Sequence, residues 1–215
     1  MKHIKYIFIF CSFLFLSNYK SYKEYEFDYI IEYKSLLSNK DDKSVFFLTN
    51  SNDNSYWASF YSIDKNKYRI SFYKPGSTRI HATILKQDFF KAATILMNRD
   101  SSGTRYIDRY SKKNHVSILK DTIVNNLKCK QYVYQSIRSM SNNLDVYYIV
   151  EPKTEFHLPM ITYGIGYKQH KLEKTQIPSG IFKELFYRNE NEEIVEGHYK
   201  LLGYQPYEKS IRVKY

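Results

Sequence analysis

The stretch Lys23-Glu-Tyr-Glu-Phe-Asp-Tyr-Ile-Ile-Glu-Tyr-Lys34 alternates large apolar residues with charged ones almost throughout. Tyr25, Phe27, Tyr29, Ile31 and Tyr33 fall on one side of an extended chain, and most of the acidic residues fall on the other. Because the side chains of a β-strand point alternately to opposite faces, this pattern predicts a strand with one buried face. The fold is therefore expected to rest on β-structure.

Alternation of this kind returns repeatedly downstream, between short polar turns, and predicts further strands. One segment differs: Gln87 to Asn98 carries apolar residues at helical spacing, which predicts an amphipathic helix of about ten residues. Lys74-Pro-Gly-Ser77 predicts a type II turn. The predicted fold class is mainly β (α+β), a curved antiparallel sheet or half-barrel with one short helix on its open side. The further predicted strands are 45–49, 56–63, 68–73, 77–85, 104–110, 115–119, 127–137, 144–150, 180–187, 194–202 and 210–215.

Upstream of the first strand, Lys2, His3 and Lys5 precede an apolar run from Tyr6 to Leu16. This run of about eleven residues is shorter than the roughly twenty that a membrane-spanning helix needs. A basic start followed by a short apolar run is typical of a secretory signal peptide. We therefore assign residues 1–21 to a signal peptide and 22–215 to one β-rich domain, with a retained tethering helix as the alternative. The expected location is the periplasm or outer cell envelope, with no membrane span in the mature chain.

The composition agrees with a folded β-rich chain, because 23 Tyr and 14 Phe stand against 7 Gly and 5 Pro. The formal net charge is +11. Its even distribution indicates a solvated basic surface, with an anionic partner as the alternative. Export argues against nucleic acid as that partner. Cys129 alone remains after the signal peptide, and its strand-like surroundings favour a buried position over a reactive thiol.

Motifs for catalysis and metal binding are missing from the sequence. There is no His-Glu-x-x-His, no Gly-x-Ser-x-Gly and no closely spaced cysteine pair. Glu155 and His157 would share one face of a strand, as an acid–base couple or as ordinary polar residues at an exposed edge. We predict no catalytic residues, no metal and no cofactor.

Large aromatic residues supply the remaining candidates for a site. The segment from Asn54 to Tyr61 carries rings on both strand faces, which suits either a strand inside a core or a strand with one face toward a cavity. A single helix over a large curved sheet favours such a cavity. The residues expected to line it are Trp57, Phe60, Tyr61, Phe89, Phe90, Leu96 and Met97.

Four stretches resemble the GLPGLI family of small exported β-proteins from Bacteroidetes-type envelopes. They are Asp121 to Lys130 with its Lys-Cys-Lys sequence, Asp145-Val-Tyr-Tyr-Ile-Val150, Phe156-His-Leu-Pro159 and Ile177-Pro-Ser-Gly-Ile-Phe-Lys-Glu184. Ser179 interrupts the family signature, its first glycine is missing, and Tyr147-Tyr148 stands where the family has Trp-Tyr. The order of elements is also similar to that of the LolA and LolB lipoprotein carriers. The resemblance implies a curved sheet closed by helices on its concave side. It implies no particular activity, because the GLPGLI family has none assigned.

Together, these observations lead us to expect an exported, non-enzymatic envelope protein that binds an apolar or acyl ligand in an aromatic-lined concavity. The alternative is a cell-surface protein–protein interaction module that uses an exposed sheet edge or a tyrosine patch. The expected partner is a lipid or acyl chain, or an envelope protein, and not nucleic acid.

Overall fold

The computed structural model describes residues 22–36, 44–74, 79–98, 114–136, 144–160, 177–189, 191 and 193–214. Within these residues the chain forms one curved sheet of eleven strands, a short helix and a 3-10 turn. The predicted fold class is confirmed. The strands are β1 (Tyr22–Ser35), β2 (Ser44–Asn50), β3 (Asp53–Ser62), β4 (Lys67–Tyr73), β5 (Ile80–Leu85), β6 (Thr94–Asn98), β7 (Asn114–Val124), β8 (Leu127–Ser136), β9 (Asp145–Val150), β10 (Phe182–Arg188) and β11 (Ile194–Lys214); the helix is α2 (Lys86–Lys91) and the 3-10 turn is η1 (Pro152–Thr154).

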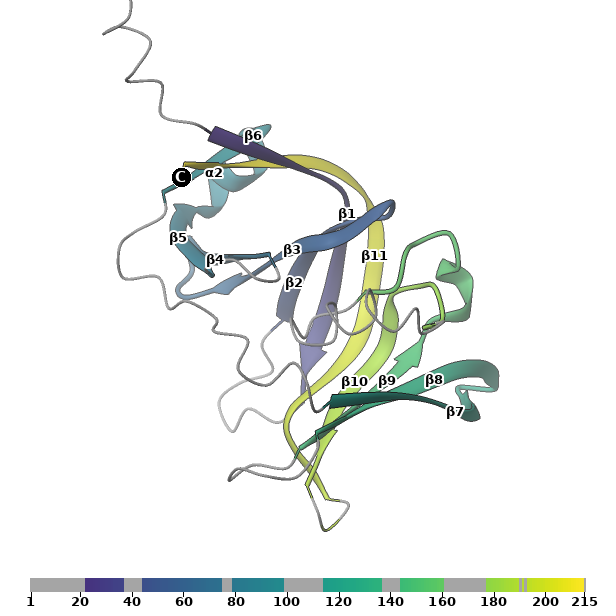
Figure 1. Cartoon of the computed structure of the whole chain (residues 1–215). Helices are drawn as coiled ribbons and strands as arrows, with labels where there is room; N and C mark the ends of the chain where they lie inside the picture. The colour runs from purple at the N-terminus through teal and green to yellow at the C-terminus, as the bar shows by residue number, and fades with distance from the viewer. Residues whose placement is uncertain are drawn as a thin grey trace, which may run out of the picture.

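Two long strands, β1 and β11, form the middle of the sheet. They pair antiparallel from Tyr22 with Lys214 to Ser35 with Tyr199, and β11 runs as one long curved band in Figure 1. The strand order is β5-β4-β3-β2-β1-β11-β10-β9-β8-β7, and β6 pairs in parallel with the end of β11. The sheet therefore has two parts that share β1 and β11: a curled lobe of β2–β6 with α2, and a wing of β7–β10 (Figure 1).

The two parts bury their apolar residues on opposite faces of the sheet. In β2, Phe46 and Leu48 belong to a first core under the curled lobe, whereas Phe47 belongs to a second core beside the wing. In β1, Phe27 and Ile30 both contact the first core, so the buried face changes between them. This change coincides with a register shift in the β1–β11 pair between Phe27 and Tyr29. An extra residue in one strand moves all later side chains to the other face, which explains two cores on one sheet.

The helix is shorter than predicted. α2 covers only Lys86–Lys91, and Thr94–Asn98 forms strand β6 instead of the second half of a helix. In β6, Ile95 and Met97 are buried while Leu96 is exposed, as expected for a strand paired with β11. The apolar spacing in this segment fits both periodicities, and the backbone hydrogen bonds offered by β11 select the strand.

The end of α2 is held by a lysine from β11. The Lys209 side chain is buried, and its Nζ donates to the backbone oxygens of Phe89 (2.6 Å) and Ala92. Phe89 lies in the last turn of the helix and Ala92 is its C-cap, where carbonyls lack intrahelical donors. Burial lowers the pKa of Lys209. This contact fixes α2 on the lobe.

Two other predictions concern the chain's last strands and the undescribed segments. The strands expected at 194–202 and 210–215 are one continuous strand, β11, which carries Pro206 opposite Tyr29 next to the register shift. Proline lacks an N–H donor, and such irregular positions accommodate it within a sheet. The signal peptide at residues 1–21, the turn at Pro75 and Gly76, and the strand at 104–110 lie outside the described residues.

Candidate functional site

Three of the seven predicted ligand-binding residues are packed inside the first core. Phe60, Phe89 and Met97 are at most 1% exposed. The Phe89 ring lies 4.4 Å from the Phe60 ring and 5.5 Å from the Tyr68 ring, measured between centroids. These are contact distances for packed aromatic rings. The interior around Phe89 is therefore filled by side chains.

The other four lie elsewhere on the molecule. Phe90 is 57% exposed and Leu96 is 64% exposed, on the outside of the lobe. Trp57 and Tyr61 are half-buried on the face of β3 that points away from the first core, and Trp57 contacts the second core. The structure thus brings together Phe60, Phe89 and Met97, and separates them from the other residues.

An open hollow lies beside the lobe, on the first-core face of β1, β2 and β11. Its volume is about 250 Å³, and its lining includes Ile30 and Phe46 together with the polar side chains of Glu32 and Gln205. None of the seven predicted residues lines it. It is a place where a small apolar group could rest against the sheet.

The outward face of β3, β4 and β5 gathers aromatic and basic side chains in three cross-strand rows. Strand pairing places Tyr61 opposite Arg69, and Arg69 opposite Thr83. Side chains opposite each other in adjacent strands lie close enough to interact. We call this surface the β3–β5 face; its rows are Trp57, Tyr73 and Arg79; Ser59, Ser71 and His81; and Tyr61, Arg69 and Thr83.

Arg79 is held in place by a ladder of stacked rings. The Tyr73 ring stacks on Trp57 at 3.8 Å between centroids, with 17° between the ring planes. The Arg79 guanidinium lies 4.5 Å from the centre of the Tyr73 ring. Stacking occupies the flat face of a guanidinium and leaves the N–H donors at its edge available. Arg79 is therefore ordered without using its main hydrogen-bonding capacity.

Ser71 and His81 form the centre of the β3–β5 face. Ser71 Oγ lies 2.8 Å from His81 Nδ1, and Arg79 Nη2 donates to the same hydroxyl at 3.5 Å. The Ser71 residue is buried, whereas His81 and Arg79 are exposed. Partial desolvation of the His81 ring, then the nearby charges of Arg79 and Arg69, lower the pKa of His81. His81 is thus neutral at pH 7, with two positive charges beside it.

Neither arginine of this face has an acidic partner in the described part of the chain. Some basic side chains elsewhere do have one: Arg212 pairs with Glu24 at 2.9 Å, and Lys130 with Glu155 at 2.8 Å. The three rows of the β3–β5 face contain no Asp or Glu. The result is an exposed patch of uncompensated positive charge bordered by aromatic rings.

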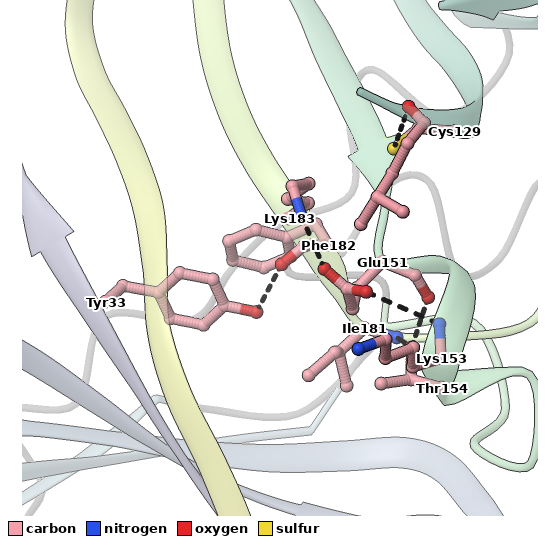
Figure 2. Close-up of polar contacts among 9 residues, drawn as sticks. Tyr33, Cys129, Glu151, Lys153, Thr154, Ile181, Phe182 and Lys183 are labelled. Atoms are coloured by element: carbon pink, nitrogen blue, oxygen red, sulfur yellow. Dashed lines mark hydrogen bonds and ion pairs between the residues drawn. The ribbon is translucent and has the colours of Figure 1, made fainter. Parts of the chain in front are cut away.

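A second polar cluster lies at the junction of lobe and wing, and its groups are satisfied internally (Figure 2). Glu151 pairs with Lys183 at 2.7 Å, with both side chains largely buried. The Thr154 hydroxyl accepts from the Ile181 N–H and donates to the Glu151 carbonyl. The Tyr33 hydroxyl donates to the Phe182 carbonyl at 2.9 Å. These bonds tie β1, η1 and β10 to Glu151, the residue that follows β9, so the cluster is structural.

The stretches that resemble the GLPGLI family meet around this junction. Cys129 from β8 is buried with Ile149 and Phe186, which confirms the predicted core position, and burial raises the pKa of its thiol. Gly180 precedes β10 with a φ of +125°, and a Cβ there would lie 2.8 Å from Thr154 Oγ1. A glycine is needed at this point because an L side chain rarely adopts that φ and the space is filled.

The structure does not bring Glu155 and His157 together as an acid–base couple. Glu155 is paired with Lys130 at the surface. His157 is buried, with Nε2 2.9 Å from Thr49 Oγ1, and burial lowers its pKa. His157 thus serves to anchor the segment after η1 to β2.

Neither a metal-binding cluster nor a membrane-spanning helix is found among the described residues. Among the described residues, no group of three or more His, Cys, Asp or Glu side chains is arranged to hold a metal ion. In the same part of the chain, no helix has the length and apolar character to cross a membrane. No family model matches the chain, and neither does any of the curated proteins compared with it.

The sequence did contain a signal for the β3–β5 face. Tyr68, Ile70 and Phe72 alternate with Arg69, Ser71 and Tyr73, so the polar residues of β4 must share its outward face. The same alternation runs through Arg79 and the residues of β5. What it does not reveal is that Arg79 lies over Tyr73, because this contact depends on the register of the two strands.

Proposed function

We propose that the protein is an exported, non-enzymatic envelope protein that binds a partner protein through its β3–β5 face. The observation that carries the proposal is the pair of exposed, unpaired arginines, Arg69 and Arg79, beside Trp57, Tyr61 and Tyr73. Tryptophan, tyrosine and arginine are the residues enriched at the energetic centres of protein interfaces. A sheet surface with these side chains is suited to contact another folded surface.

The partner surface is acidic. Arg69, Arg79 and the neighbouring Lys67 give this face a positive charge that its own residues do not neutralise. Charge complementarity steers association and excludes like-charged partners. Without residues 1–21, which carry Lys2, Lys5 and Lys20, the formal net charge of +11 falls to +8, and this charge attracts the same kind of partner over longer distances.

A carrier of apolar or acyl ligands is the second candidate. Its support is the open hollow with Ile30 and Phe46, because these apolar side chains lie against solvent. The filled interior around Phe89 weighs against a large enclosed ligand site. The interaction module is therefore the better supported of the two.

Site-specific photo-crosslinking in the native host tests the proposal. A photoreactive amino acid at Thr83, on the β3–β5 face, should yield one discrete adduct with another protein, whereas the same residue at Lys120 on the wing should not. Exchanging Arg69 and Arg79 for Gln should abolish the Thr83 adduct, and the purified partner should bind the wild type again in vitro. Equal adducts from Thr83 and Lys120, or an acyl ligand co-purifying without any adduct, would contradict it.

Export has its own test. Replacing Phe13 and Leu14 with Asp places charge in the apolar run, which should keep the protein in the cytoplasm. Normal export of this double variant would contradict the proposed role of Tyr6 to Leu16 as an export signal, and with it the location in the cell envelope.

A further inference from the structure

We propose that Arg79, Ser71 and His81 form a subsite for a carboxylate group of the partner, and that carboxylate binding and protonation of His81 favour each other. This inference rests on the proposed function for the origin of the carboxylate, an Asp or Glu side chain of the partner protein. The chemistry of the subsite itself can be tested without the partner.

Arg79 is the principal ligand in this subsite. Its guanidinium is fixed over the Tyr73 ring, so the two N–H groups at one edge can donate to both oxygens of a carboxylate. Because the side chain is already ordered by stacking, little conformational freedom is lost on binding. The absence of an acidic partner in the described residues leaves this edge unoccupied by protein carboxylates.

Ser71 and His81 can reorganise when the anion arrives. In the neutral tautomer that carries its proton on Nε2, Nδ1 accepts a hydrogen bond from the Ser71 hydroxyl, whose Oγ lies 2.8 Å away. When His81 gains a proton, Nδ1–H donates to Ser71 Oγ instead, and the Ser71 hydroxyl becomes free to donate to a carboxylate. One proton therefore adds both a positive charge and a hydrogen-bond donor at the subsite.

The surroundings of His81 set the direction of the coupling. The charged groups facing it are Arg79, just before β5, and Arg69 on β4, and the β3 residues of the face are uncharged. Partial desolvation of the His81 ring and these two cations lower the pKa of His81. A bound carboxylate offsets the positive charge and so raises this pKa. By linkage, carboxylate affinity must rise as the pH falls through the His81 titration.

The test uses the whole protein, a capped hexaglutamate peptide and its hexaglutamine counterpart. NMR titration of His81, assigned with His81→Asn, should show a higher pKa with hexaglutamate than with hexaglutamine. For a rise of one unit, hexaglutamate affinity should increase about tenfold as the solution is acidified through the His81 titration. His81→Asn should keep binding at pH 7.5 and lose this increase.

Two matched variants localise the effect. Arg79→Gln and Lys120→Gln each remove one positive charge from an exposed side chain, so both lower non-specific attraction equally. Arg79→Gln should reduce hexaglutamate affinity at least fivefold more than Lys120→Gln does. An unchanged His81 pKa with hexaglutamate, or equal losses in the two variants, overturns the subsite. If hexaglutamate gives the expected results but Thr83 yields no crosslinked partner, the carboxylate subsite is supported and the partner-binding function is rejected.

Discussion

Truncation of Phe89 distinguishes a filled lobe from a ligand cavity. Phe89 is 0% exposed, and its ring contacts those of Phe60, Tyr68, Phe90 and Tyr207 at centroid distances of 4.4 to 6.4 Å. Exchange for Ala removes all four contacts at once and leaves a space of ring size. The neighbouring exposed ring of Phe90 provides a matched control.

The expected loss follows from the rigidity of the surroundings. Phenylalanine-to-alanine changes in cores cost about 3–5 kcal/mol, and less where the site can collapse. Here the neighbouring rings of Phe60 and Tyr68 stand on paired strands, which cannot move inward without losing ladder hydrogen bonds. We therefore expect about 4 kcal/mol for Phe89→Ala. Phe90→Ala should cost about 1 kcal/mol, because over half of its side chain already meets water.

Urea unfolding followed by fluorescence of Trp57, the one tryptophan, measures both losses. Phe89→Leu, expected to cost about 1–2 kcal/mol, keeps the comparison possible if the alanine variant does not fold. Fluorescent fatty-acid binding is measured on the same proteins, and no binding inside the lobe is expected. Similar small losses for Phe89→Ala and Phe90→Ala, with fatty acid bound by the wild type, would refute the filled lobe and restore the carrier hypothesis.

Three further changes test the lobe–wing junction and its buried groups. Gly180→Ala should lower the free energy of unfolding by about 2–3 kcal/mol, because of the positive φ and the contact with Thr154. The control Gly203→Ala, with open space around it, should change the free energy of unfolding by less than about 1 kcal/mol. Because the pKa of His157 is lowered in the folded protein, His157 of the unfolded state is protonated first as the pH falls below about 6.5. The free energy of unfolding should therefore decrease on acidification, by at most about 1.4 kcal/mol per pH unit. The decrease should be less steep in His157→Gln. An identical pH slope in both proteins would contradict this. Cys129 should resist a thiol reagent until the protein unfolds, and Cys129→Ser should cost about 1–2 kcal/mol; rapid labelling of the folded protein would reject the buried position.

The strands could be predicted because their signal is local. Alternation from Lys23 to Lys34 requires an extended chain whichever neighbours it has, and β1 covers this stretch. The segment from Thr94 to Asn98 was wrongly assigned to a helix because its apolar spacing suits both structures. The deciding contact is with Ser210–Lys214, more than one hundred residues away, and no short window of sequence contains it.

The two cores also depend on a non-local feature. β1 alone suggests one buried face from Tyr25 to Tyr33, since its odd residues are apolar throughout. The register shift against β11, between Phe27 and Tyr29, divides this row between two faces. A bulge is a property of a strand pair, so neither strand reveals it separately.

The division of the buried residues between two faces of the sheet explains why the β3–β5 face lies outside the predicted cavity. The second core lies on the outward side of β2 and β3, where the Phe47 ring is 5.5 Å from Trp57. Trp57 stacks on Tyr73, and the Arg79 guanidinium lies over the Tyr73 ring. These contacts connect the second core to the exposed charge of Arg79. An arginine anchored in this way keeps its donors at a defined position, whereas a free surface arginine samples many. Trp57, one of the aromatic residues of β3 that suggested a ligand cavity, thus helps to hold a charged group on the face opposite the first core.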